Sequence, residues 1–198
     1  MSAPDDLIAE AQAALEASHP DEARALVDRA FREHPEDARV QELYMALHLA
    51  RAIRLSAHAR EMRREDIARR EIPVDTDFED SPEVSNAFDE ATRAIEEVLA
   101  VDPRNEKALM MKASLVFRRD RATGRPEALG ILHAIMDANP ANRQVLYTIR
   151  KIEVPCKRCS DSGFCLRCRG RGSRRILGMQ TTCEACHGQG ICLLCGIL

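Results

Sequence analysis

The sequence has no tryptophan and few other aromatic residues: its 198 positions hold two tyrosines and five phenylalanines. Because proteins that bind single-stranded nucleic acid stack bases on aromatic side chains, this composition disfavours a stacking surface. No run approaches the ~18 apolar residues of a membrane span, so we expect no membrane segment. Residues 1–10 contain Asp5, Asp6 and Glu10 where a secretory signal has a basic start and an apolar core. We therefore expect a cytoplasmic protein.

Motifs of common catalytic sites are also missing. The chain contains no Gly-x-x-x-x-Gly-Lys phosphate loop, no Gly-x-Ser-x-Gly elbow and no His-Glu-x-x-His zinc motif. Its histidines are scattered and form no paired constellation. We predict that the protein is not an enzyme.

Cysteine is absent from residues 1–155, and charge is divided in a similar way. Residues 1–149 carry 20 Lys and Arg against 29 Asp and Glu, whereas residues 150–198 carry 9 against 3, so the formal charges are −9 and +6. The sequence therefore predicts two domains, at 1–152 and 153–198.

Three similar proline-containing breaks divide the first 152 residues: His34-Pro35-Glu36-Asp37, Asp102-Pro103-Arg104-Asn105 and Asn139-Pro140-Ala141-Asn142. Proline disfavours helix for the residue before it and is tolerated in a first helical turn, so each break ends one helix and starts the next. Small and apolar residues at helical spacing precede each break and predict a buried helix face. These ladders are Ala23, Val27, Ala30; Ala91, Ile95, Val98; and Ala128, Leu132, Ile135. We predict helices near 5–17, 21–34, 37–70, 83–101, 104–121, 126–138 and 141–152.

The spacing of these breaks resembles that of tetratricopeptide repeats, which have a period of 34 residues. Pro35 and Pro103 lie 68 residues apart, and Pro103 and Pro140 lie 37 apart. The resemblance covers about residues 5–152 and implies a mainly α fold, an array of helical hairpins with a groove for a protein or peptide partner. The middle unit departs from the pattern, with an extended third helix and an acidic loop, Ile72 to Asp80, within 37–82. Thr123-Gly124-Arg125 accounts for the three residues beyond 34 and is predicted to be an insertion between helices.

Two further features of the helical part have both a structural and a functional interpretation. Five arginines on the long third helix form either a solvated face or a docking surface for an acidic partner, and the acidic run Asp75, Asp77, Glu79 and Asp80 can fold against them. They are Arg60, Arg63, Arg64, Arg69 and Arg70. His19-Pro20-Asp21 spells the tripeptide of J-domains, but no basic helix precedes it, so we interpret it as a turn with proline in a first helical position.

All eight cysteines form four Cys-x-x-Cys pairs, separated by 5, 14 and 5 residues. Two thiolates three residues apart supply two corners of a zinc tetrahedron, so two pairs complete one ion and leave no open position. The two links of five residues, one on each side of a central hairpin, Arg169 to Thr182, are equal in length and favour nested grouping of the cysteine pairs. Grouping of neighbouring cysteine pairs is the alternative. In the nested arrangement the inner zinc has ligands Cys165, Cys168, Cys183 and Cys186, and the outer zinc has Cys156, Cys159, Cys192 and Cys195. His187 is a turn residue or, alternatively, a substitute ligand.

This C-terminal part resembles the DnaJ-type cysteine-rich zinc domain, which repeats Cys-x-x-Cys-x-Gly-x-Gly four times. The repeats beginning at Cys165 and Cys183 match fully, whereas the first has Asp161 in place of a glycine and the last has Gly196 shifted. The resemblance covers about residues 154–198 and implies a small β-ribbon, two structural zinc ions and contact with an unfolded client. An iron–sulfur cluster or disulfides are rival uses of these cysteines.

The most concrete function is a zinc-binding, non-enzymatic protein-interaction scaffold or co-chaperone-like adaptor. One alternative is zinc-dependent, non-specific RNA or DNA binding through the arginine-rich hairpin, with Arg167, Arg169, Arg171, Arg174 and Arg175. Another is a Cys-x-x-Cys thiol–disulfide redox factor, which requires an exposed pair with a lowered thiol pKa.

Overall fold

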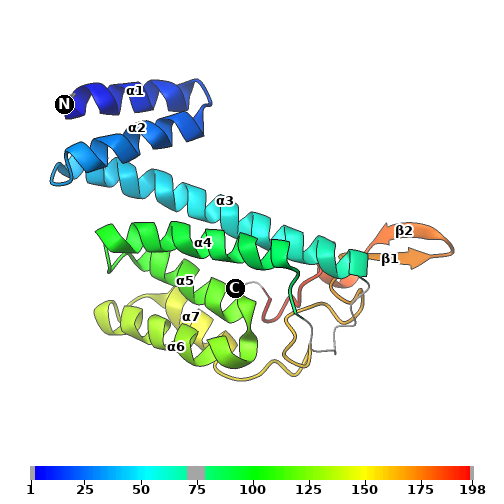
Figure 1. The fold of residues 1–198 in the computed structure, drawn as a ribbon. Coiled ribbons are helices and arrows are strands. Elements are labelled where there is room, and N and C mark those ends of the chain that lie inside the picture. Colours follow the sequence, from blue (N-terminus) through cyan, green and yellow to red (C-terminus); the bar gives the residue numbers. More distant parts are fainter. Residues whose placement is uncertain (1–2, 71–78, 197–198) are drawn as a thin grey trace.

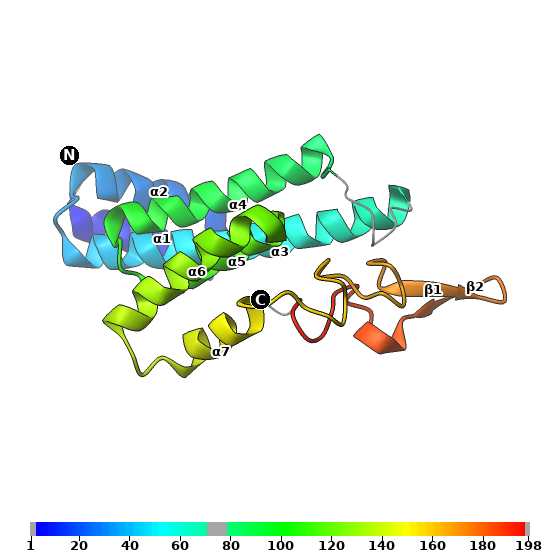
Figure 2. The same cartoon turned by 90° about the horizontal axis from the view of Figure 1, so that it is seen from below.

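The computed structural model describes residues 3–70 and 79–196. Within them the helices are α1 (Pro4–Glu16), α2 (Pro20–Glu33), α3 (Ala38–Arg70), α4 (Pro82–Val101), α5 (Glu106–Arg119), α6 (Arg121–Ala138) and α7 (Arg143–Ile152). Strands β1 (Ser173–Ile176) and β2 (Met179–Thr182) and the 3₁₀ turn η1 (Glu184–Cys186) follow. Figure 1 and Figure 2 show α1 beside α2, α3 beside α4 and α5 beside α6, with the strands beyond the end of α3. The mainly helical fold with a small C-terminal two-stranded sheet is confirmed.

The predicted ladders form the core of this array. All nine ladder residues are buried, with exposed fractions of at most 1%. Leu7, Ala30 and Val40 join α1, α2 and α3, whereas a larger cluster around Phe88 joins α3, α4 and α5. A third cluster, which includes Phe117, packs α5 against α6 and α7. Each helix therefore buries one face against the next, which is how a helical period in the sequence becomes a packed layer.

The three proline breaks form the same turn, which differs from the prediction in one respect. The backbone amides of Asp37, Asn105 and Asn142 each bond the carbonyl three residues earlier, at 3.1 to 3.2 Å. Proline is therefore the second residue of a β-turn, a position that its fixed φ suits, and is not in a helical turn. The next helices begin at Ala38, Glu106 and Arg143, because the Asp or Asn side chain accepts amide hydrogen bonds and caps the helix.

Pro20, in contrast, is the first residue of α2, as predicted for His19-Pro20-Asp21. His19 is exposed and lies 3.4 Å from the carboxylate of Glu22 within the same first turn. The tripeptide thus starts a helix of the array, which confirms its interpretation as a turn.

The prediction of an insertion at Thr123-Gly124-Arg125 is wrong, because α6 begins at Arg121 and includes Pro126. Asp120 caps this helix by accepting hydrogen bonds from the amides of Ala122 and Thr123. Gly124 lies so close to α5 that an added Cβ would be 2.4 Å from the carbonyl oxygen of Val116. The cap and the close packing hold the segment helical although Pro126 cannot donate a backbone bond.

The long helix α3 has 33 residues, about 50 Å at 1.5 Å per residue. Most of the predicted acidic loop, including Asp75 and Asp77, lies outside the described residues, but Asp80 pairs with Arg63 and the Glu79 carbonyl accepts a bond from Arg70. Among the helices that the structure describes, none combines the length and apolar character needed to cross a membrane.

Candidate metal centres and their attachment

The structure brings the eight cysteines together in two groups of four. Cys165, Cys168, Cys183 and Cys186 form one group, and Cys156, Cys159, Cys192 and Cys195 form the other. Within each group the sulfur atoms all lie within 4.8 Å of one another, and every cysteine is buried and unbridged. This is the nested grouping, so the pairing of neighbours is excluded.

The sulfur separations suit a single tetrahedral ion. Zinc bonded to sulfur at about 2.3 Å requires sulfurs about 3.8 Å apart. The Sγ atoms of Cys159 and Cys195 are 3.4 Å apart, and those of Cys168 and Cys186 are 3.6 Å apart. These distances exceed the roughly 2.05 Å of a disulfide. Each group can therefore hold one metal ion, whereas a cluster of several irons needs more room between its cysteines.

An antiparallel ribbon carries the two groups. Strands β1 and β2 pair from Ser173 with Thr182 to Ile176 with Met179, and Phe164 bridges Ile191 further along the ribbon. The amides of Cys165 and Cys192 donate to the carbonyls of Gly190 and Gly163, at 2.9 and 2.8 Å. The equal arms in the sequence thus become paired backbone, which places the second cysteine pair opposite the third and the first opposite the fourth.

Glycines of the repeats turn backbone amides toward the inner sulfurs. Gly172 and Gly190 have φ of +73° and +71°, and their amides donate to Sγ of Cys168 and Cys186 at 3.3 Å. Such bonds stabilise thiolates, because they place partial positive charge beside the sulfur. A Cβ on Gly190 would lie 2.1 Å from the carbonyl oxygen of Gly170. Both the positive φ and this close approach therefore require glycine at position 190.

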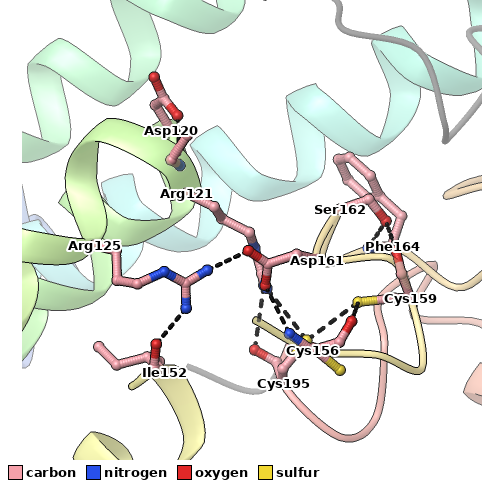
Figure 3. Close-up of polar contacts among 11 residues, drawn as sticks. Asp120, Arg121, Arg125, Ile152, Cys156, Cys159, Asp161, Ser162, Phe164 and Cys195 are labelled. Atoms are coloured by element: carbon pink, nitrogen blue, oxygen red, sulfur yellow. Dashed lines mark hydrogen bonds and ion pairs between the residues drawn. The ribbon is translucent and has the colours of Figure 1, made fainter. Parts of the chain in front are cut away.

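Asp161, which occupies a glycine position in the first repeat, attaches the outer group to the helices (Figure 3). It adopts φ +61°, and its carboxylate accepts a hydrogen bond from the amide of Cys156 at 3.0 Å. The same carboxylate pairs with Arg125 of α6, which also donates to the carbonyl of Ile152 at the end of α7. The departure from the repeat is therefore one of the points at which the cysteine-rich module contacts the helical array.

Three more arginines of the array contact the module. Arg121 of α6 donates to Sγ and the carbonyl oxygen of Cys195, both at 3.2 Å, as Figure 3 shows. Arg118 of α5 donates to the carbonyl of Gly196 at 2.9 Å. Arg64 of α3 donates to the carbonyl of Gly188 at 3.2 Å. No pattern in the sequence predicts these contacts, apart from Asp161 standing where the repeat has glycine.

The arginine cluster of α3 is therefore not a uniform solvated face. Arg63 is largely buried, lies over the Phe88 ring at 4.2 Å and pairs with Asp80, and Arg64 contacts the module. Arg69 and Arg70 pair with the buried Asp66 and remain accessible. Part of the arginine cluster on helix α3 thus stabilises the packing of the helical array and its junction with the ribbon.

The thiol environments do not favour a redox pair. Burial raises the pKa of the second cysteine of every pair, at Cys159, Cys168, Cys186 and Cys195. Against the effect of burial, hydrogen bonds from neighbouring cysteines lower the pKa of Cys156 and Cys183. A reactive dithiol needs an accessible, low-pKa sulfur, and none of these buried sulfurs offers the required access.

His187 and the hairpin arginines lie outside the sulfur groups. His187 is exposed, has φ +50° and ends η1, so its interpretation as a turn residue is confirmed. Arg167, Arg169, Arg174 and Arg175 are exposed, and within the described residues no carboxylate pairs with them. The hairpin is therefore a basic surface.

The fold and site define a class of protein: an array of helical hairpins that ends in a ribbon with two four-cysteine groups able to hold metal ions. No protein-family model, curated protein or solved structure matches this chain. The tetratricopeptide and DnaJ-type resemblances accordingly remain predictions that depend on the motifs of the chain itself.

Proposed function

We propose that this chain is a non-enzymatic, zinc-binding adaptor of the co-chaperone type. The observation that carries the proposal is the closed character of both cysteine groups: four buried sulfurs surround each position, which leaves no ligand place for a substrate. Such a zinc ion organises the chain and does not act on a bound molecule. Zinc binding contributes roughly 10 to 16 kcal/mol in small domains, enough to order a ribbon with little apolar core.

A groove beside the outer cysteine group supplies the surface for a protein or peptide partner. Its volume is about 390 Å³, and its wall is formed by α5, α7 and the end of the ribbon, with Met110, Phe117, Tyr147, Ile152 and Leu194. Tyr147 is 60% exposed, and the ammonium group of Lys151 lies 5.1 Å from the centre of its ring. An apolar groove with an accessible aromatic side chain suits the insertion of a large apolar residue of a peptide.

The ribbon tip supplies a second apolar surface, suited to an unfolded client. Leu177 is 94% exposed and Met179 67% exposed; they flank Gly178 and follow the basic residues Arg174 and Arg175. Leu177 also has φ +50°, a conformation that costs a leucine about 1 kcal/mol. The tip is therefore unfavourable for the isolated chain both in solvation and in backbone conformation, and a bound apolar segment would offset the first cost.

Binding of a reduced, unfolded model polypeptide tests this function. We expect the zinc-loaded chain to slow aggregation of the polypeptide, and Leu177→Asn to weaken the effect severalfold, because asparagine tolerates positive φ while removing apolar surface. Leu15→Gln is the matched control, since Leu15 is also exposed but lies on α1, at the opposite end of the molecule in Figure 1. Equal activity of both variants, or full activity after removal of zinc, would contradict the proposal.

Nucleic-acid binding is a second candidate, supported by the unpaired arginines of the hairpin described above. Such binding would be non-specific and strongly dependent on salt, because it depends on phosphate contacts. A titration of RNA and DNA at several salt concentrations separates the two candidates: Arg174→Gln with Arg175→Gln should abolish nucleic-acid binding and leave polypeptide binding unchanged.

A further inference from the structure

A second pocket lies where α3, α5 and α6 meet the ribbon, away from the apolar groove described above. Its volume is about 400 Å³, within the range of small-molecule sites. Five of its lining residues are arginines, and the one acidic lining residue is Glu61. The arginines are Arg60, Arg63, Arg64, Arg118 and Arg121.

Three of these guanidinium groups have carboxylate partners within the protein. Arg63 pairs with Asp80, Arg64 with Glu61, and Arg121 lies 3.6 Å from Asp161. Within residues 3–70 and 79–196, no carboxylate pairs with Arg60 or Arg118: Arg60 donates to the carbonyl of Ser56, and Arg118 to the Ser114 hydroxyl and a backbone carbonyl. The pocket thus contains two positive charges that no carboxylate of the described residues compensates.

The surroundings of the pocket make these two positive charges energetically unfavourable. Burial, together with repulsion by Arg60, Arg121 and Arg63, lowers the pKa of Arg118 to about 9. An anion between these groups would relieve the repulsion, and guanidinium groups bind phosphate through paired hydrogen bonds. The rest of the wall includes the apolar side chains of Phe164 and Ile191 together with Ser162 and Gln189, so the pocket combines a cationic side with a partly apolar surface for a ring.

We propose that this pocket binds a small molecule that joins a phosphate group to an apolar or aromatic ring, of the nucleotide class. Arg60 and Arg118 hold the phosphate, and the ring lies against Phe164 and Ile191. This site is independent of the polypeptide-binding surfaces. Its position at the junction means that a bound ligand contacts both the helical array and the ribbon.

Titration of the full, zinc-loaded chain with adenosine monophosphate tests the site, with adenosine at the same ionic strength as the matched ligand. We expect the monophosphate to bind and adenosine to bind at least about tenfold more weakly, since one charge-assisted contact accounts for about that factor. Arg60→Gln should weaken binding of the monophosphate about tenfold or more. Arg174→Gln removes the same charge on the exposed hairpin and should leave the affinity unchanged.

Three outcomes would overturn the proposal. The first is no binding of the monophosphate at millimolar concentration by a chain that retains its metal. The second is equal weakening by Arg60→Gln and Arg174→Gln, which would indicate general charge attraction. The third is binding only after Asp75→Asn and Asp77→Asn, which would show that the carboxylates of the chain itself neutralise the pocket. Circular dichroism and zinc content establish that each variant is folded.

Discussion

Replacement of Arg121 by methionine tests whether the helical array stabilises the outer metal site. Methionine retains the apolar stem of the side chain but ends before the guanidinium, which lies 4.5 Å over the Phe117 ring. It removes the bonds to Sγ and the carbonyl of Cys195. Among the residues that the structure describes, no arginine bonds the inner sulfurs, of which those of Cys168 and Cys186 accept bonds from the amides of Gly172 and Gly190. The substitution should therefore act on one site of the two.

The magnitude follows from the chemistry of that contact. A hydrogen bond to a charged group contributes about 1.5 to 3 kcal/mol. Solvent weakens this interaction little, because the Arg121 side chain is only 12% exposed. Since 1.4 kcal/mol is a factor of about ten, the affinity of the outer site for zinc should fall about 10- to 100-fold.

Native mass spectrometry at increasing chelator concentration measures this effect, because it counts chains with two, one or no zinc ions. Arg121→Met should produce a one-zinc species at about 10- to 100-fold less chelator than the unaltered chain, and Arg174→Met should not. The retained ion is assigned to the inner site if adding Cys183→Ser removes it. Simultaneous loss of both ions, or identical release curves for the two arginine variants, would refute the reasoning.

Three further predictions concern the ribbon and α6. Cys183→Ser should reduce bound zinc from two ions to one and abolish protection of the β1–β2 hairpin in hydrogen exchange, because the inner tetrahedron loses a ligand. Gly190→Ala should lower the melting temperature of the ribbon and weaken the inner site, since an alanine Cβ would overlap the Gly170 carbonyl; Gly178→Ala, at a turn with open space, is the control. Asp120→Ala should cost about 1 kcal/mol of stability at neutral pH in urea unfolding. The Thr123 hydroxyl, against the effect of burial, holds the pKa of Asp120 below its ordinary value, so this contribution is full above about pH 4 and disappears as the pH falls through the lowered pKa; a difference that persisted in acid would contradict the cap.

Much of the fold was predictable because its signals are local. A buried helix face needs apolar residues every three or four positions, and the ladders supplied them before each break. The start of α6 was not predictable in this way, because Pro126 signals a helix start by itself. What overrides it is packing: Gly124 allows α6 to approach α5, and Asp120 caps a helix that begins five residues earlier.

The sequence by itself favoured the nested grouping of the sulfurs, since links of equal length on either side of one hairpin can close on each other through backbone pairing, and the structure then excluded the pairing of neighbours. The sequence did not determine how the ribbon sits on the helices. That placement depends on pairs such as Arg125 with Asp161 and Arg64 with Gly188, which are 36 and 124 residues apart. Contacts over such distances have no period or motif in the chain. They form only because the packed helices fix the position of each arginine side chain. The junction and its cationic pocket are therefore properties of the tertiary structure.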